Sequence, residues 1–194
     1  MVTPAPLLPK PFSQLSLTEA AELLAARKLP PVETWHPERS GDSAMEIRAD
    51  GGWYHEGGRI DRPAMVRLFS TILRREPDGS HVLVTPAERL RIAVEDTPFR
   101  AVEMKSEGEG KERRLVFRLD TDDLVLAGAD HPLSFGRDPD SPDPRLHARG
   151  AIGNGLEARI DRALYYEMVE MALADSWEPP AIWSNGARFP LVDA

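Results

Sequence analysis

Apolar residues recur with helical spacing in two stretches of the chain, and both stretches follow the same four residues. The string Arg-Ile-Asp-Arg occupies positions 59–62 and again positions 159–162. The apolar residues after each copy lie three and four positions apart, as on one face of an α-helix. They are Ala64, Met65, Leu68, Phe69, Ile72 and Leu73 in the first stretch and Leu164, Tyr165, Met168, Val169, Ala172 and Leu173 in the second. This pattern predicts a duplicated hairpin-plus-helix unit in which both helices bury the same stripe.

The residues around each copy of the string predict how the helices begin. Asp61 and Asp161 each end a strand-like segment, where a carboxylate commonly accepts hydrogen bonds from the free N–H groups of the following helix. Pro63 suits the first helical turn. We therefore interpret both aspartates as helix caps rather than as catalytic groups. Earlier in the chain, Ser16 and Glu19 form an S-x-x-E capping box that predicts another helix.

Alternating apolar and polar residues predict strands in the rest of the chain. Met45 and Ile47 alternate with polar neighbours before a turn at Asp50-Gly51, which predicts a short hairpin. Pro77-Asp78-Gly79 interrupts the pattern, and many short strand-like segments separated by turn residues follow it. The chain is thus expected to be an α+β protein with three parts, namely an N-terminal domain at residues 1–80, a β-rich domain at 81–176 and a tail at 177–194 that docks on the body.

The predicted second domain contains several successive strands closed by one helix. Such a run predicts a strongly bent sheet or a partly open barrel that a C-terminal helix caps. This outline resembles a pleckstrin-homology-like domain. In the tail, proline excludes a helix, but the large apolar residues Trp183, Phe189 and Leu191 favour docking over a free segment.

Composition narrows the classes of protein that remain. The chain has 194 residues, 41% of them hydrophobic, which supports a folded core. Its formal net charge of −8 disfavours nucleic acid and anionic membranes as partners. The absence of cysteine excludes disulfides, thiolate metal sites and cysteine nucleophiles. The chain has neither a signal-like N-terminus nor an apolar run of about 20 residues, so we expect a cytoplasmic protein.

The sequence contains no established catalytic motif. Asp138 to Asp143 begins like a calcium loop but lacks the required glycine and the final glutamate. The histidines are scattered, and we expect no metal or cofactor. Glu95-Asp96 is the one carboxylate pair at a strand end, where it would serve as acid and base or, in the favoured interpretation, hold a turn. Basic residues around the domain boundary form either a basic surface or a mixed-charge surface, and the mixed-charge surface is favoured. They are Arg74, Arg75, Arg89, Arg91, Lys111, Arg113 and Arg114.

A set of short motifs resembles a bacterial family catalogued as domain of unknown function 1285. The motifs extend from Trp35 to Pro190 and are specific only together; they are Trp35-His36-Pro37, Gly41-Asp42, Asp50-Gly51-x-Trp53, Pro63 to Leu73, Leu83-Val84-Thr85-Pro86-x-Glu88, Val94 to Phe99, Asp130-His131-Pro132-Leu133 and Ile182-Trp183-Ser184. The resemblance implies two domains, an internally duplicated core and a second domain superficially like a pleckstrin-homology domain. It also implies a role in ligand binding at the domain interface, with these candidate lining residues: Trp35, Asp42, Trp53, Arg62, Thr85, Glu95 and Asp96.

Three functional hypotheses follow from these observations. The first is a non-enzymatic ligand-binding or regulatory module, with a role in bacterial signal transduction, that holds a small molecule or peptide between the two domains. The second is a hydrolase-type enzyme that uses Glu95 or Asp96 as acid or base. The third is a protein–protein scaffold that self-associates or pairs through an exposed strand edge.

Overall fold

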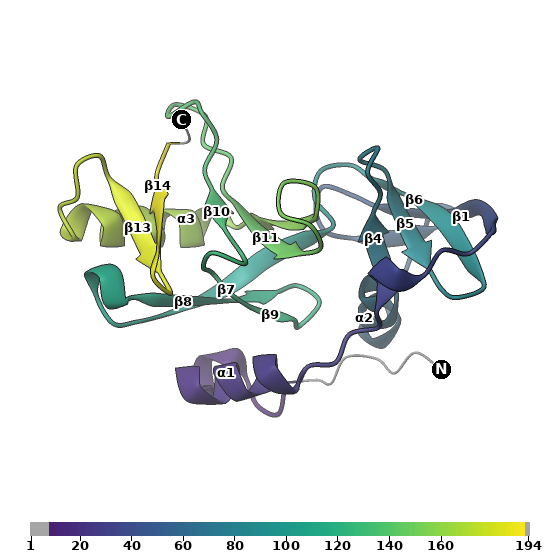
Figure 1. Ribbon diagram of the computed structural model, residues 1–194, viewed down its shortest axis with the longest axis horizontal. Coiled ribbons are helices and arrows are strands. Elements are labelled where there is room, and N and C mark those ends of the chain that lie inside the picture. The colour runs from purple at the N-terminus through teal and green to yellow at the C-terminus, as the bar shows by residue number, and fades with distance from the viewer. Residues whose placement is uncertain (1–7, 193–194) are drawn as a thin grey trace.

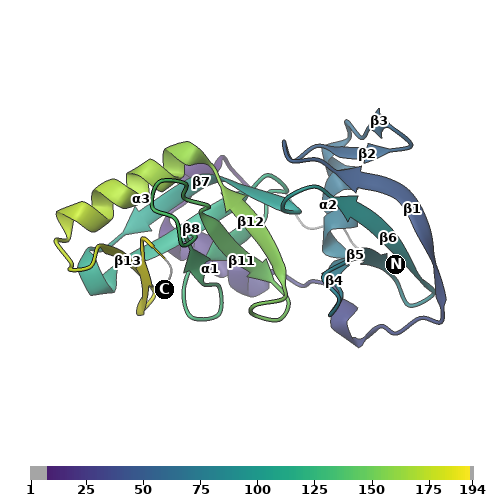
Figure 2. The ribbon, with the colours of Figure 1, turned by 90° about the horizontal axis from the view of Figure 1, so that it is seen from above.

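The computed structural model describes residues 8–192, which form two curled six-stranded sheets side by side (Figures 1 and 2). The strands of the first sheet are β1 (Arg39–Ile47), β2 (Trp53–His55), β3 (Gly58–Arg59), β4 (Leu73–Arg75), β5 (His81–Val84) and β6 (Glu88–Val94). Those of the second are β7 (Phe99–Glu107), β8 (Arg114–Leu119), β9 (Leu124–Leu126), β10 (Leu133–Ser134), β11 (Arg145–Arg149) and β12 (Leu156–Ile160). The protein is therefore of mixed α+β type, as predicted.

The two sheets have the same strand order. The first runs β3-β2-β1-β6-β5-β4, and the second runs β9-β8-β7-β12-β11-β10 when read in the equivalent direction. In each, the first and last strands lie at the centre as a parallel pair, β1 with β6 and β7 with β12, while every other pairing is antiparallel. The duplication thus lies in two whole sheets of identical topology.

The repeated Arg-Ile-Asp-Arg string does not mark that duplication. Helix α2 (Pro63–Thr71) follows the third strand of its sheet, which is the edge strand β3, whereas α3 (Arg162–Ala174) follows the sixth strand, the central β12. The two copies of the string therefore occupy non-equivalent positions. The predicted hairpin-plus-helix repeat is wrong in this respect, because a helix that follows a strand leaves the same local pattern wherever that strand lies in its sheet.

The aspartates in the string do not cap the helices as predicted. Arg62 is the N-cap residue of α2, and Asp61 is exposed, with its nearest charged partner Arg59 at 3.7 Å. Asp161 does occupy the N-cap position of α3, but its side chain makes no capping hydrogen bond. It instead accepts hydrogen bonds from the Arg100 side chain at 2.7 and 3.1 Å. An oppositely charged guanidinium on a neighbouring strand is a stronger partner than a neutral N–H group.

The division of the chain lies later than the sequence pattern placed it. Strands β5 and β6 pair within the first sheet, and β4 pairs with β5, so a boundary at residue 80 falls between two strands of one hairpin. Pro77-Asp78-Gly79 forms the turn of that hairpin, with the Gly79 N–H donating to the Glu76 carbonyl at 2.9 Å and Gly79 at a φ of +84°. The chain crosses from the first sheet to the second at residues 95–98.

The N-terminal helix packs on the second sheet, although the sequence pattern predicts that it belongs to the first domain. In α1 (Leu17–Ala26) the predicted capping box forms, with Glu19 N–H donating to the Ser16 hydroxyl at 3.1 Å and Ser16 N–H donating to the Glu19 carboxylate at 2.7 Å. Its apolar face contacts β8 and β9, and the ribbon lies beneath these strands (Figure 1). The chain then passes through the 3₁₀ turn η2 (Val32–Thr34) to enter the first sheet.

The C-terminal residues pack against the second half of the molecule. They form a hairpin of β13 (Ala181–Ser184) and β14 (Ala187–Pro190) beside α3. Ile182 is fully buried, and the Ser184 hydroxyl accepts from Leu115 N–H at 2.9 Å and donates to the Ala127 carbonyl at 2.7 Å. Because β13 satisfies these buried backbone groups, the hairpin is an integral part of the second half.

One hydrophobic core joins the two halves. It continues from Ile47, Trp53 and Leu73 in the first half to Phe99 and Phe117 in the second. Each of these side chains is at most 2% exposed. The halves are therefore packed together, and an open cleft does not separate them. Within the described residues, no helix is long and apolar enough to span a membrane.

Candidate functional site

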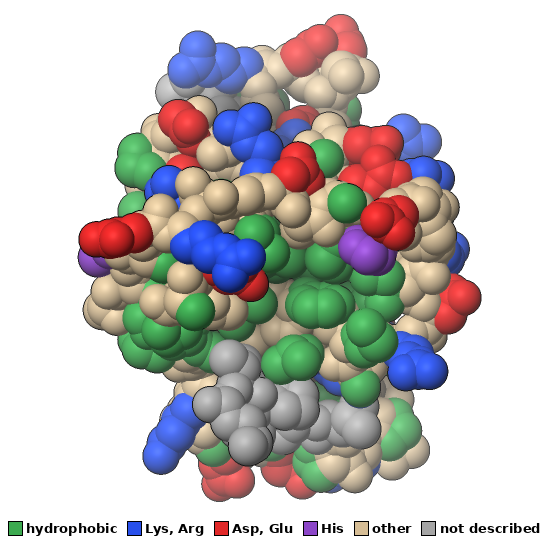
Figure 3. Space-filling view, turned by 90° about the vertical axis from the view of Figure 1, so that its right-hand side faces the viewer, with side chains coloured by type: hydrophobic (Ala, Val, Ile, Leu, Met, Phe, Trp, Pro, Cys, Tyr) green, Lys and Arg blue, Asp and Glu red, His purple; other side chains and the backbone are tan. Residues whose placement is uncertain are grey.

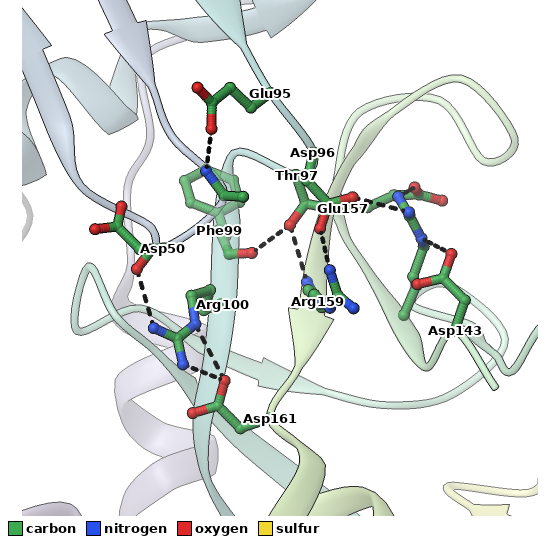
Figure 4. Close-up of polar contacts among 12 residues, drawn as sticks. Asp50, Glu95, Asp96, Thr97, Phe99, Arg100, Asp143, Glu157, Arg159 and Asp161 are labelled. Carbon is green, nitrogen blue, oxygen red and sulfur yellow. Dashed lines mark hydrogen bonds and ion pairs between the residues drawn. The ribbon is translucent and has the colours of Figure 1, made fainter. Parts of the chain in front are cut away.

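Residues 95–98 form the link between the two halves, and polar contacts attach this link to both sheets (Figure 4). Asp96 accepts hydrogen bonds from Arg145 at 3.0 Å and from Arg159 at 2.8 Å. Thr97 is buried, and its hydroxyl donates to the Phe99 carbonyl at 2.9 Å. These bonds attach the link to β11 and β12, so the crossing between the sheets is a fixed segment of the second half.

Arg100 adds a contact from β7 to the first sheet. Its Nη1 donates to the carbonyl of Asp50 in the β1–β2 turn at 3.0 Å, while its other nitrogens bind Asp161 (Figure 4). Gly51 lies against the same arginine, and a Cβ at Gly51 would come within 2.8 Å of the Asp120 carboxylate. The close approach and the φ of +83° explain why glycine is needed in this turn.

A pocket of about 400 Å³ opens where the two halves meet at β4 and the β11–β12 turn. We call it the interface pocket. Its walls come from the η2 segment, from β4 with the turn that follows it, from β6, and from residues 149–156 of the second half. The residues that line it are Glu33, His36, Pro37, Arg74, Arg75, Glu76, Pro77, Arg89, Arg149, Gly150, Ala151, Asn154, Gly155 and Leu156.

Two arginines of the interface pocket are occupied by structural contacts. Arg74 is 7% exposed and donates to the carbonyls of Val32 and Trp35 at 2.7 and 2.8 Å, and it forms an ion pair with Glu76 at 2.6 Å. Arg89 binds the other oxygen of Glu76 at 3.3 Å and keeps 41% of its side chain exposed. Glu76 thus neutralises Arg74 in full and Arg89 in part.

Arg149 ties the second half to the first. Its Nη2 donates to the carbonyls of Ser70 and Leu73 at 2.5 and 3.0 Å, which lie where α2 ends and β4 begins. Its Nε is buried and has no hydrogen-bond partner in the structure. Desolvation, and then the nearby charge of Arg27, lower the pKa of Arg149 to about 10, so the group remains cationic at neutral pH.

Arg75 is the arginine of the interface pocket with the weakest contacts. Its Nε donates to the Gly79 carbonyl and its Nη1 to the Gly155 carbonyl, both at 3.4 Å, and no carboxylate pairs with it among the described residues. Both bonds are long for a guanidinium, which normally binds an anion at about 2.7 to 2.9 Å. Arg75 is therefore able to accept an anionic ligand without losing a strong internal bond.

The interface pocket carries a local excess of positive charge. Four arginines and two glutamates line it. His36 and Asn154 also line it, and their side chains can donate hydrogen bonds to a ligand or accept them from it. The Asn154 side chain already bridges the halves by donating to the Glu76 carbonyl at 3.1 Å. On a chain of net charge −8, this pocket favours a small anion such as a carboxylate or phosphate.

The residues that the family resemblance suggested do not gather at one site. Trp53 is 2% exposed in the core, and Trp35 packs against the buried residues Val82 and Val84. Asp42 and Thr85 hold local turns, Asp42 by accepting from Ala44 N–H at 2.7 Å and Thr85 by accepting from Glu88 N–H at 3.2 Å. These four residues therefore have structural roles in the first half.

The remaining three suggested residues, Glu95, Asp96 and Arg62, have different structural environments. Glu95 is exposed and accepts from Ala49 N–H at 2.9 Å, which fastens the link to the β1–β2 turn. Asp96 is held by its two arginines, and Arg62 lies exposed at the start of α2. None of the three lines the interface pocket.

The sequence signal for the interface pocket was present in part. The sequence marks Arg74, Arg75 and Arg89 as part of a possible basic surface, whereas its pattern predicts only a strand end at Arg149 and a hairpin turn at Asn154. Arg149 and Asn154 line the same pocket as Arg74 and Arg75, although about 75 residues of sequence separate the two pairs. A local sequence pattern cannot predict a contact between residues so far apart. Among the described residues, no group of three or more side chains is arranged to hold a metal ion.

Family models cover most of the chain in two adjoining parts. The N-terminal domain of the domain of unknown function DUF1285 matches residues 30–97, and the C-terminal domain of the same family matches residues 98–191. The chain belongs to the DUF1285 family. The two matches meet inside the link between β6 and β7, which agrees with the division of the strands into two sheets.

Solved structures of the family support this membership. A DUF1285 family protein from Silicibacter pomeroyi DSS-3 is 38% identical, with a TM-score of 0.75 over 92% of this chain and 96% of that one. A DUF1285 family protein from Shewanella baltica OS155 is 25% identical, with a TM-score of 0.51 over 69% of this chain and 96% of that one. No curated protein matches the chain.

Proposed function

We propose that this DUF1285 protein is a non-enzymatic ligand-binding module that holds a small anionic molecule in the interface pocket. The observation that carries this proposal is Arg75, a pocket arginine whose guanidinium makes only two hydrogen bonds to described residues, both long ones to carbonyls at 3.4 Å. A carboxylate or phosphate would give Arg75 the short, charge-assisted bonds that it lacks. Arg89, which is partly exposed, supplies a second cation on the same wall.

The position of the interface pocket supports a regulatory role for such a ligand. Its walls come from both halves, so a bound anion would contact the first sheet through Arg75 and the second through residues 149–156. A ligand that binds only the joined arrangement stabilises it by mass action. The proposal also includes a role in bacterial signal transduction and a cytoplasmic location. It further includes a pleckstrin-homology-like character of the second half, and the curled sheet and helix α3 of that half support this last point.

The hydrolase alternative has weaker support. A general base needs a free carboxylate that a substrate can approach. Asp96 is bound by two arginines, and Glu95 is bound to the backbone of the β1–β2 turn. Both carboxylates therefore have structural partners.

The substitution Arg75→Gln tests the anion site. Thermal-shift screening of the full chain against inorganic phosphate, simple dicarboxylates and phosphorylated metabolites identifies binders, and calorimetric titration then gives their affinity. We expect Arg75→Gln to weaken binding of any such anion about tenfold to a hundredfold, because one charge-assisted contact is lost. Arg137→Gln is the matched control, since Arg137 is exposed and lies outside the interface pocket.

Three results would contradict the anion site. One is equal anion affinity in Arg75→Gln and Arg137→Gln. Another is binding that does not weaken as the salt concentration rises, because a guanidinium–anion contact is screened by salt. The third is the absence of any thermal shift with the anions of the panel.

A further inference from the structure

Helix α2 leaves part of its apolar face uncovered. Met65 is 37% exposed, and Val66, Leu68 and Phe69 are only half-buried, so none of these large side chains is fully removed from water. By contrast, Met168 in α3 is completely buried. A helix with a clear apolar stripe normally packs that stripe against a core. A stripe that remains exposed on a folded protein marks a surface for another molecule.

The uncovered face borders a groove between α2 and the edge of the first sheet. This groove has a volume of about 640 Å³, and its apolar lining residues are Met45, Ile60, Met65 and Phe69. A second hollow of about 320 Å³ shares three residues with it and continues along α2 to the turn at Asp120 and Thr121. We call the two together the α2 groove. The first sheet forms one end of the molecule, and Figure 3 shows hydrophobic side chains gathered at the centre of that end.

The rim of the α2 groove is basic. Arg59, Arg62, Arg67 and His55 line it together with two carboxylates, those of Asp61 and Asp120. Arg62 is exposed, and its side chain makes no hydrogen bond or ion pair with any described residue, while Arg59 reaches Asp61 only at 3.7 Å. On a chain of net charge −8, a basic rim around an apolar floor complements acidic groups on a partner.

The edge of the groove offers backbone groups as well. Strand β3 is the outermost strand of its sheet, and Gly58 and Arg59 pair with β2 on one side only. An extended segment can add to such an edge through backbone hydrogen bonds while its alternate side chains enter the adjacent groove. The strand is short, so the side chains in the groove would supply most of the affinity.

We propose that the α2 groove docks a peptide segment of a partner protein in which bulky apolar residues stand next to aspartate or glutamate. The apolar residues would cover Met65 and Phe69, and the acidic ones would pair with Arg62 and Arg59. Methionine adapts its shape to a variety of apolar side chains. Methionine, aromatic residues and arginine are also the types that protein interfaces favour. This site is separate from the interface pocket and does not depend on the anion site proposed there.

A random peptide display library selected on the immobilised full chain tests the proposal, because such a selection does not require the partner to be identified. We expect the enriched peptides to combine large apolar residues with Asp or Glu. The strongest of them, made synthetically and labelled, is then measured by fluorescence polarisation. We expect Met65→Glu to weaken its binding at least tenfold, because a charge enters the apolar floor, and Arg62→Glu to weaken it severalfold by removing the charge match.

Leu173→Glu is the matched control for this experiment. Leu173 is an exposed apolar residue of the other long helix, α3, with 60% of its surface exposed, so the same change of charge and polarity is made away from the groove. We expect this variant to bind the peptide like the unmodified chain. Thermal melts of all three variants confirm that each remains folded, as the exposed positions of Met65 and Leu173 lead us to expect.

Three outcomes would overturn the proposal. The first is a selection that enriches no peptide combining apolar with acidic residues. The second is equal loss of peptide binding in Met65→Glu and Leu173→Glu, because the contact would then not be specific to the groove. The third is a dimer, detected by light scattering, that Met65→Glu dissociates, because the groove would then belong to a second copy of the chain.

Discussion

The first and second sheets have the same strand order, but they differ in how far helices and other elements cover them. In the second half, α3 buries Met168 and Ala172 completely, α1 covers β8 and β9, and the β13–β14 hairpin packs beside α3. In the first half, α2 is the only α-helix among the described residues, and its large apolar residues stay half-buried or exposed. Equal topology has therefore not produced equal cores. More elements cover the second sheet, while the first half presents the α2 groove.

The largest expected effect compares two phenylalanines in the two halves. Phe117 on β8 is fully buried, whereas Phe69 on α2 is half-buried. Phe117→Ala should lower the free energy of unfolding by about 3 to 5 kcal/mol, because it leaves a cavity in a packed core, and Phe69→Ala should lower it by only about 1 kcal/mol. Urea unfolding of both variants checks this. Similar losses in the two would contradict the contrast between the halves.

A smaller effect is expected where the halves are joined. Arg149→Met removes the guanidinium that binds the carbonyls of Ser70 and Leu73 but keeps a long, unbranched side chain. We expect a loss of about 2 kcal/mol in the free energy of unfolding, because two carbonyls at the contact between the halves lose a charged donor. Hydrogen exchange should show faster exchange at the α2–β4 junction than in the second sheet. Unchanged protection at that junction would show that the shared core alone joins the halves.

The smallest of the three effects is a dependence on pH in the first half. Burial, and then the charge of Arg75, lower the pKa of His81 on β5 from 6.5 to about 4. The folded state therefore resists protonation of this histidine, so its contribution to stability is complete above pH 6.5 and is lost as the pH falls towards 4. We expect a loss of about 1 kcal/mol between pH 7 and pH 5, because the imidazole is only partly buried and solvent screens its charge. In His81→Gln, urea midpoints at the two pH values should show that this part of the decrease has disappeared.

Local features of the fold were predictable from the sequence. The capping box at Ser16 and Glu19 forms as expected, and the hairpin predicted around Asp50-Gly51 forms from β1 and β2. The membership in the DUF1285 family also agrees with the resemblance carried by short motifs. These features depend on neighbouring residues or on the identity of residues in sequence, so the sequence contains the information directly.

The candidate site was predictable only in part. Arg75 and Arg89 stood out as basic residues near the boundary, but Arg149 reaches them from the other half of the chain. Most candidate residues of the resemblance hold turns, the core or the link between the sheets, because recurring motifs include residues that a fold needs for its own turns. Arg62 is the exception, since it lies exposed at the start of α2. Spacing along the chain does not distinguish a residue that holds a turn from one that faces a ligand.

The sequence by itself determined the positions of most strands and helices, the α+β class and the family. Only the tertiary structure decided that the duplication lies in two whole sheets, that α1 packs on the second of them and that the halves divide after β6. The physical reason is that helix and strand periods are local, whereas strand order and helix docking depend on contacts between residues far apart in the chain. Arg-Ile-Asp-Arg illustrates this difference, since identical residues follow an edge strand in one half and a central strand in the other.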